Sequence, residues 1–323
     1  MLSDTEYGIL KTVIVGDATD ARIPDLDIST RTINYVDKKL EEIPSAGLYP
    51  KQVIEEANED LETFCQFLIK ENVEVLRPNR EHKPLYYNYC PRDTVLVYKD
   101  TILAAPSPIR ARANEYKAFE HHLKKYTDPV RIIIKRDDSL YNQECLGNPD
   151  QLSLNEIEPA FDAANVLRDG DNLYYLVSNS GNELGANYLK ELFPKSYVWP
   201  IKGVYSYMHL DSTLAILRDG LLLCNPARIK RIDQLPKPLQ SYDIIWCPEP
   251  YDIGHYPGIC NASIWINMNL FSINSNLVVL EKNQNSLRKE LEKYGIDCAM
   301  LPMRHQRTLG GGFHCVTLDL VRK

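Results

Sequence analysis

Three segments of the chain repeat one pattern, in which an acidic residue precedes an apolar run that ends in a basic residue and an aspartate. The segments are 93–100, 162–170 and 211–220, and a second apolar run follows each of them. An Asp-Gly pair, found in the second and third segments, is a strong hairpin signal between apolar runs. A fourth copy, 267–274, begins with asparagine instead. Hairpins repeated at this spacing predict a fold of similar sheet modules, as in propellers.

The leading acids of these segments are Asp93, Asp162 and Asp211. Each is expected at the start of an equivalent strand. If the modules pack around a common axis, the three carboxylates converge on that axis. The alternative is that hairpins resemble one another and that aspartate is common before strands.

The rest of the chain predicts a mixed α/β protein. Apolar runs indicate further strands at 9–15, 131–135, 173–177, 221–224, 243–246 and 277–280. Apolar residues at spacings of three and four predict helices over 51–71, 114–126 and 284–294, and short strands at 73–76 and 297–301 follow the first and last of these. No linker or low-complexity segment divides the chain, so one domain over 1–323 is expected.

Composition excludes several classes of function. The net charge is −7 and no basic block occurs, which argues against nucleic acid as a partner. No apolar run is long enough to span a membrane, and the N-terminal residues do not have the pattern of a secretory signal. The eight cysteines are scattered without a C-x-x-C pair, which argues against a disulfide framework and a structural zinc site. We therefore expect a cytoplasmic protein with reduced thiols.

A glycine-rich motif, Gly-Gly-Gly-Phe-His-Cys at 310–315, precedes a last predicted strand at 316–320. Because glycine has no Cβ atom, other atoms can approach its backbone closely and its φ can be positive. The thiol of Cys315 would then lie between an unobstructed loop and a rigid strand, where it could act as a nucleophile. The alternative is a small buried apolar residue before the last strand, since free cysteines are often buried.

His209 is the expected proton carrier, because imidazole titrates near neutral pH. It stands two residues before Asp211, so on a strand the two side chains share one face. His314 is the rival, but on an extended segment its side chain would point away from that of Cys315. A structural role is the alternative for either histidine.

Carboxylates gathered near a thiolate are costly unless a cation joins them. A guanidinium meets this need because it is planar and rich in N–H donors, and carboxylates bind it bidentately. Its central carbon is open to attack by Cys315, and His209 could protonate the departing amine. Arg228, after the third hairpin, could hold a substrate carboxylate, although a lone arginine there is ordinarily a solvated surface charge.

The chain resembles the L-arginine amidinotransferases, which include the arginine:glycine and arginine:inosamine-phosphate enzymes. The shared motifs are 90–93 (CPRD), 161–165 (FDAAN), 208–211 (MHLD), 225–226 with Arg228, and 310–315. They follow the family's order over nearly the whole chain. The resemblance implies a five-module α/β-propeller of ββαβ units with pseudo-fivefold symmetry, of the guanidino-modifying enzyme type.

The resemblance also implies roles for individual residues in ping-pong transfer from L-arginine. Cys315 would form an amidino-cysteine, His209 would carry protons, and Asp162 would pair with His209 and the guanidinium. Asp93 and Asp211 would bind guanidinium nitrogens, and Arg228 the arginine carboxylate. Met208 would also contact the substrate, and Ser263 would be a weaker contact with the carboxylate. Neither a metal nor an organic cofactor is expected, and a homodimer is possible because family members are often dimers.

The acceptor amine stays open among a small amino acid, an aminocyclitol and a biosynthetic-pathway amine. Segments 161–168 and 178–185 look closest to the inosamine-phosphate branch, whereas Met208 looks more like the glycine-type enzymes. The rival functions are a guanidine hydrolase of the arginine deiminase type and a non-catalytic arginine-binding protein. A cysteine protease is more distant, because converging carboxylates suit a cation better than a peptide carbonyl.

Overall fold

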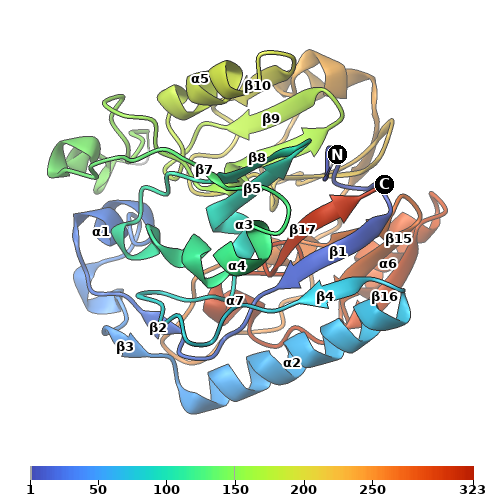
Figure 1. Ribbon diagram of the computed structural model, residues 1–323, viewed down its shortest axis with the longest axis horizontal. Helices are drawn as coiled ribbons and strands as arrows, with labels where there is room; N and C mark the ends of the chain where they lie inside the picture. The colour runs from blue at the N-terminus through green and yellow to red at the C-terminus, as the bar shows by residue number, and fades with distance from the viewer. Residues whose placement is uncertain (1, 149) are drawn as a thin grey trace.

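The computed structural model describes residues 2–148 and 150–323 (Figure 1). Within these residues the strands form five three-stranded sheets and one two-stranded sheet. Sheet by sheet, the strands are β17 (Thr317–Arg322), β1 (Leu10–Val15) and β4 (Glu74–Leu76); β5 (Val95–Tyr98), β6 (Thr101–Ala104) and β7 (Val130–Arg131); β8 (Val166–Asp169), β9 (Asn172–Leu176) and β10 (Tyr197–Ile201); β11 (Leu214–Arg218), β12 (Leu221–Cys224) and β13 (Asp243–Trp246); β14 (Phe271–Asn274), β15 (Leu277–Glu281) and β16 (Asp297–Leu301); with β2 (Arg22–Ile23) beside β3 (Gly47–Leu48).

All five three-stranded sheets have the same connectivity. The first two strands are antiparallel and the third is parallel to the second. A parallel neighbour requires a crossover connection, whereas an antiparallel neighbour needs only a tight turn. The crossovers contain the helices, so each module runs strand, strand, helical segment, strand. The repeat predicted from the sequence is therefore present, and the fourth copy forms β14 and β15.

Four of the three-stranded sheets are built from consecutive strands, and the fifth joins the two ends of the chain. In that sheet β17, the last strand, pairs antiparallel with β1, the first. Figure 1 shows red β17 beside blue β1, with the N- and C-termini close together. The C-terminal glycine motif is thereby held at one end of a sheet that the N-terminal residues complete.

The helical segments are mostly short. They are α1 (Ile28–Ile33), α2 (Lys51–Lys70), α3 (Pro91–Thr94), α4 (Glu120–Leu123), α5 (Glu183–Leu192), α6 (Asn285–Glu292) and α7 (Gln306–Leu309), with 3-10 turns η1 (Leu40–Glu42), η2 (Arg110–Arg112), η3 (Glu115–Ala118), η4 (Asp138–Leu140), η5 (Gln143–Cys145), η6 (Ala163–Asn165), η7 (Ile232–Gln234), η8 (Lys237–Ser241) and η9 (Ile264–Met268). The long helix α2 buries Leu61, Phe64 and Leu68 in the core that also holds Phe313. Burial of one such side chain stabilises the fold by about 1.5–3 kcal/mol.

Two predicted elements differ from the structure. The helix expected over 114–126 is broken into η3 and α4 around Phe119, although its apolar residues Tyr116, Phe119 and Leu123 are all buried as expected. The strand expected over 131–135 is only β7, because its pairing with β6 stops at Arg131 and Ile133 is almost fully exposed. For residues 114–126 the apolar pattern correctly predicted which side chains are buried, but it did not predict where the helix is interrupted.

Short helical turns precede the first strands of several sheets and position the site. Asp93 lies in α3 directly before β5, and Asp162 caps η6 before β8. Asp211 lies in the turn before β11. The leading acids therefore stand beside the strand starts, as predicted, but on turns instead of on the strands themselves.

Candidate active site

The structure brings the predicted residues to one cavity of about 500 Å³. Its lining includes six of them: Met208, His209, Asp211, Arg228, Ser263 and Cys315. Asp93 lines a small adjoining pocket together with Met208 and His209. Asp162 is fully buried and contacts His209. The eight side chains come from segments as far apart as 93 and 315, so only the tertiary structure assembles them.

Cys315 lies in the turn just before β17, with its thiol buried at the cavity. Its backbone N–H donates to Asn269 Oδ1 at 3.0 Å, and its Sγ lies 3.3 Å from Asp211 Oδ2. A hydrogen bond with the Cys90 thiol, then burial, then the charges of Asp211 and Asp93 raise the pKa of Cys315 well above its ordinary value. The thiolate needs a cation at this place before it can form readily.

The three glycines before Phe313 allow close packing around this thiol. Gly310 has φ of 82°, in the left-handed region that glycine adopts without strain. A Cβ on Gly311 would lie 2.5 Å from Cys90 Sγ, and one on Gly312 would lie 2.9 Å from the Asn269 side chain. Both distances are too short for any side chain. Glycine is therefore needed at 311 and 312 because other atoms pack against the backbone, and at 310 because the backbone is left-handed there.

His209 is held by two carboxylates from the helical turns that precede β5 and β8. Its Nε2 lies 3.1 Å from Asp162 Oδ2, and its Nδ1 lies 3.8 Å from Asp93 Oδ1. Burial opposes the imidazolium, but Asp93 and Asp162 outweigh this effect and raise the pKa of His209 to about 9. The ring is therefore charged at neutral pH. Its backbone φ of 58° is unusual for a residue other than glycine, and such strain is often found at functional sites.

The argument that His209 and Asp211 share one strand face is wrong. Strand β11 begins only at Leu214, and the positive φ of His209 breaks the alternation of side chains that a strand would give. His209 contacts Asp162, while Asp211 contacts His314 and Cys315. Both residues still line the cavity, but they reach it through turn geometry.

The argument against His314 was also wrong in its premise. Residues 313–316 form a turn, so neighbouring side chains do not alternate as they do in an extended segment. His314 Nδ1 and Cys315 Sγ both meet the same atom, Asp211 Oδ2, at 2.8 and 3.3 Å. His314 is nevertheless absent from the residues that line the main cavity.

Two buried carboxylate oxygens at the site lack hydrogen bonds. Asp93 Oδ1 and Asp162 Oδ1 have no hydrogen-bond partner among residues 2–148 and 150–323. Burial raises the pKa of Asp93. At Asp162 burial has the same tendency, but the hydrogen bond from His209 outweighs it, so the pKa of Asp162 is lowered. Buried polar atoms without partners are rare and costly, so these oxygens indicate a place for a hydrogen-bond donor.

Arg112 and Glu115 hold Asp93 in place, and the sequence analysis missed both. Arg112 Nη1 donates to Asp93 Oδ2 at 2.7 Å, and Arg112 Nε donates to Glu115 Oε2 at 2.8 Å. All three side chains are buried. An Arg-x-x-Glu spacing is ordinarily a surface pair, so nothing in the sequence marked this one.

Arg228 lies on the cavity wall and is held by neutral groups. Its Nη1 donates to Ser212 O, Ser212 Oγ and Thr213 Oγ1 at 2.7–2.9 Å, and its guanidinium stacks 3.4 Å from the centre of the Tyr205 ring. Among the ion pairs of the described residues, none joins Arg228 to a carboxylate. Burial lowers its pKa. The arrangement leaves its positive charge available to an anionic group.

Asn269 is a further site residue, which the sequence analysis missed. It accepts from Cys315 N–H and donates from Nδ2 to Asp211 O at 3.4 Å. Asn269 stands two residues before β14, just as Asp93 stands two before β5 and Cys315 two before β17. The leading residue assigned to the fourth repeat, Asn267, instead accepts from Gln284 and Gln306. Alignment on the strand starts does not distinguish Asn269 from Asn267, because Asp162 stands four residues before β8 just as Asn267 stands four before β14.

Among the described residues, no group of three or more His, Cys, Asp or Glu side chains is arranged to hold a metal ion. None of the helices in this part of the chain is long and apolar enough to cross a membrane.

A buried thiol and three carboxylates, with an imidazole and a guanidinium on the same cavity, are the parts of an enzyme active site for a cationic substrate. No family model matches the chain. It is 40% identical over 336 residues to inosamine-phosphate amidinotransferase 1 of Streptomyces glaucescens, covering 98% of this chain and 95% of that protein. It is 29% identical to L-arginine:L-lysine amidinotransferase of Pseudomonas savastanoi pv. phaseolicola, covering 99% and 94%.

The solved structure of an inosamine-phosphate amidinotransferase from Streptomyces griseus superposes with a TM-score of 0.94 at 37% identity, covering 100% of this chain and 97% of that one. The chain therefore belongs to the amidinotransferase family and is a transferase.

Proposed function

We propose that this amidinotransferase moves the amidino group of L-arginine to an acceptor amine through a covalent intermediate on Cys315. One observation carries the proposal. The buried Cys315 thiol lies near Asp211 and Asp93, and Asp162 contacts His209 on the same site. Asp93 and Asp162 each have an oxygen without a hydrogen bond. A guanidinium supplies both the positive charge and the N–H donors that this place lacks.

In the bound complex, Asp93 and Asp211 receive the guanidinium nitrogens. Arg228, which no carboxylate of the described chain neutralises, binds the carboxylate of arginine. Ser263 and Met208 complete the cavity wall around the substrate. The positive charge of the bound guanidinium offsets the carboxylate charges near Cys315 and lowers the pKa of its thiol. The thiol then releases its proton to solvent and becomes a thiolate.

The first half-reaction forms the bond between sulfur and the guanidino carbon. The bond from that carbon to the side-chain nitrogen of arginine breaks, and His209 gives this nitrogen the proton that it needs to leave in ornithine. His209 is suited to the role because its pKa of about 9 keeps it protonated at neutral pH. Asp162, at 3.1 Å, orients the ring and stabilises its charge.

The second half-reaction reverses these steps with a new amine. The neutral acceptor nitrogen attacks the amidino carbon and passes a proton to His209. The sulfur–carbon bond then breaks and the thiolate returns. Each half-reaction leaves the enzyme ready for the other, which is ping-pong transfer.

The cavity favours an acceptor that carries an anionic group. Three cations, Lys38, Arg228 and Arg307, line it beside two carboxylates, Asp37 and Asp211. Arg307 also pairs with Asp252, and Lys38 donates to Cys260 O, so these two are partly engaged at the rim. A phosphorylated aminocyclitol and an amino acid both carry such a group. The relative at 40% identity is named an inosamine-phosphate amidinotransferase, so a phosphorylated aminocyclitol is the first acceptor to test.

We infer that the five three-stranded sheets are the blades of an α/β-propeller with pseudo-fivefold symmetry. The support is their common connectivity together with the site itself. Asp93, Asp162, Asp211, Asn269 and Cys315 each stand two to four residues before a strand of a different sheet. Contacts among them and with His209 bring these five residues around one place. We also infer a single catalytic domain over 1–323 and a cytoplasmic location suited to its eight free cysteines. A homodimer is an expectation from the family resemblance alone.

Intact-protein mass spectrometry tests the proposal. The enzyme is mixed briefly with L-arginine, quenched in acid and mapped by peptides. The expected result is one added amidino group on the peptide that contains Cys315, with ornithine in solution. The trapped intermediate is then offered phosphorylated aminocyclitols, amino acids and uncharged amines, and the acceptor is the amine that removes the adduct fastest.

Two other outcomes would identify a different function. Citrulline released without any acceptor would indicate a guanidine hydrolase. Arginine binding without an adduct or product would indicate a non-catalytic arginine-binding protein.

A further inference from the structure

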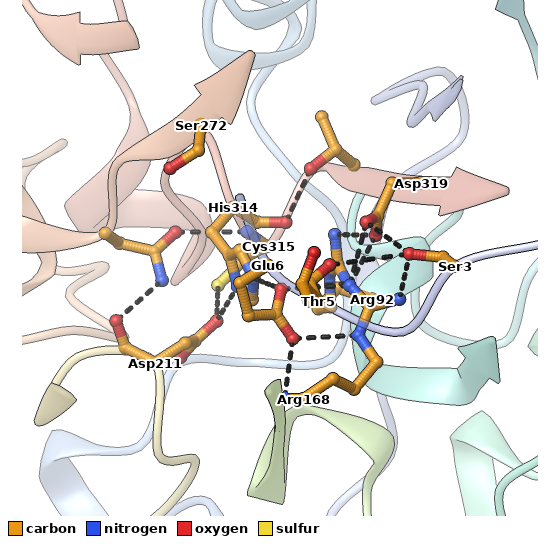
Figure 2. Close-up of polar contacts among 12 residues, drawn as sticks. Ser3, Thr5, Glu6, Arg92, Arg168, Asp211, Ser272, His314, Cys315 and Asp319 are labelled. Atoms are coloured by element: carbon orange, nitrogen blue, oxygen red, sulfur yellow. Dashed lines mark hydrogen bonds and ion pairs between the residues drawn. The ribbon is translucent and has the colours of Figure 1, made fainter. Parts of the chain in front are cut away.

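A cluster of buried charges lies behind the candidate active site (Figure 2). It comprises Glu6, Arg92, Arg168, His314, Asp319 and Arg322, all of them buried. Arg168 Nε lies 2.8 Å from Glu6 Oε1, and Arg92 Nη2 lies 2.6 Å from Asp319 Oδ1. Arg168 also donates to Val97 O of β5, and Arg322 donates to Ser272 O of β14. The cluster thus connects several sheets with the N-terminal segment.

His314 joins this cluster to the site. Its Nε2 lies 3.2 Å from Glu6 Oε2, and its Nδ1 lies 2.8 Å from Asp211 Oδ2. Ionised carboxylates only accept hydrogen bonds, so both ring nitrogens must carry a hydrogen, and the ring is an imidazolium.

The charges around His314 agree with this assignment. Burial disfavours ionisation of Glu6 and Asp211, but Arg168 lowers the pKa of Glu6 and His314 lowers that of Asp211 to about 2. Both carboxyls are therefore ionised at neutral pH. Burial and the positive charge of Arg92 oppose the imidazolium, but Asp211 and Glu6 outweigh them and raise the pKa of His314.

The Cys315 thiol meets the same carboxylate oxygen as His314. Asp211 Oδ2 receives His314 Nδ1 on one side and Cys315 Sγ, at 3.3 Å, on the other. Figure 2 shows the three residues together, with Glu6 adjacent to the ring. The imidazolium places a positive charge beside the carboxylate oxygen that the thiol meets. This charge opposes the effect of Asp211 and Asp93, which disfavour the thiolate of Cys315.

We propose that His314 is a positioning residue, an imidazolium held by Glu6 that fixes the Asp211 carboxylate against Cys315 and supplies the charge that balances its thiolate. The inference rests on the proposed role of Cys315 as nucleophile. His314 does not line the main cavity, so it acts through Asp211 and does not touch the substrate. Its role therefore differs from that of His209, which faces the cavity.

The test measures the reactivity of Cys315 itself. Iodoacetamide alkylation, followed by peptide mapping, reports the thiolate fraction at each pH without any turnover. In His314→Asn an amide can still donate to Asp211 but carries no charge. We expect its Cys315 alkylation profile to move upward by about one pH unit, which is about a tenfold lower rate at a fixed pH below the thiol pKa.

Two further variants keep the test decisive. His314→Lys restores a positive charge and should recover part of the lost reactivity. His305→Asn is the matched control, because His305 is also buried and paired with a carboxylate, Glu56 Oε2 at 2.7 Å, but lies outside the cavity lining. It should leave the Cys315 profile where it is in the unmodified enzyme.

An unchanged alkylation profile in His314→Asn overturns the inference, and so does a fall in thermal midpoint without a shift of the profile. The proposed function fails separately, if Cys315→Ser turns over arginine normally. Because alkylation is measured without substrate, the two failures are distinguishable.

Discussion

His209 Nε2 lies 3.1 Å from Asp162 Oδ2, and this contact joins two segments that are 47 residues apart in the chain. The aspartate is fully buried, and the histidine keeps only 14% of its side chain exposed. Neither residue lies in a strand: Asp162 caps η6, and His209 adopts a left-handed backbone. The contact between Asp162 and His209 therefore forms because two turns pack against each other, and no strand positions either residue.

Asp162→Asn should reduce turnover by about 100-fold or more, because general acid–base catalysis commonly contributes a factor of this size. Asp169→Asn is the matched control. Asp169 belongs to the same repeat, but its carboxylate accepts from Tyr7 and Tyr242 and does not reach His209. Steady-state kinetics of both variants, with thermal midpoints measured alongside, decide the matter. Equal losses of rate would contradict the role given to Asp162.

Cys315→Ser should abolish turnover and leave arginine binding in place, because the hydroxyl is a far weaker nucleophile of similar size. Amidino transfer is measured by release of ornithine, and binding by calorimetry. Cys298→Ala, a half-buried thiol outside the cavity lining, is the control and should retain activity. Turnover near that of the unmodified enzyme in Cys315→Ser would remove the central claim.

Arg228→Ala should weaken arginine binding by about 2 kcal/mol or more, as expected when one member of a desolvated charge pair is lost. An arginine analogue that lacks the α-carboxylate should bind both proteins equally. Calorimetry in a Cys315→Ser background avoids turnover. Arg231→Ala is the control, since Arg231 forms an exposed pair with Asp233. A similar loss for both ligands would show that Arg228 does not hold the carboxylate.

His209 makes stability depend on pH in a definite direction. Its pKa rises from the ordinary 6.5 to about 9 in the folded chain, so the folded state binds the proton more tightly than the unfolded state. The stabilisation is complete below pH 6.5 and is lost as the pH rises through about 9. Its size is on the order of 3 kcal/mol.

Urea unfolding of the unmodified protein and of His209→Asn, at pH values on either side of this window, measures the effect. The difference in free energy of unfolding between the two proteins should shrink as the pH rises. The exposed His255→Asn serves as control. A difference that grows with pH would reverse the sign predicted for His209.

Gly311→Ala should destabilise the protein by about 1–3 kcal/mol, the usual range for an overpacked core. The new methyl group would lie 2.5 Å from Cys90 Sγ. Cys90→Ala removes that atom, so the double variant should be more stable than the sum of the two single effects allows. Chemical denaturation of the four proteins forms a double-mutant cycle. Simple additivity would mean that Cys90 is not what excludes a side chain here.

The sequence predicted the modules well because hairpin signals are local. The strands over 221–224, 243–246 and 297–301 match β12, β13 and β16, and the 51–71 helix matches α2 to within one residue. The helix over 114–126 failed because the same apolar spacing is met by a 3-10 turn followed by one short helical turn, and periodicity does not distinguish the two.

The sequence by itself determined the repeat, the acids before the strand starts, the thiol after the glycine run, and the family to which the chain belongs. These features depend on residue types and short spacings, which survive without knowledge of the fold. Only the tertiary structure decided which groups meet. Glu6 and His314 are 308 residues apart, and the left-handed backbone of His209 replaces the strand geometry assumed for it. Such contacts depend on turn conformation and long-range packing, which no local pattern of residues records.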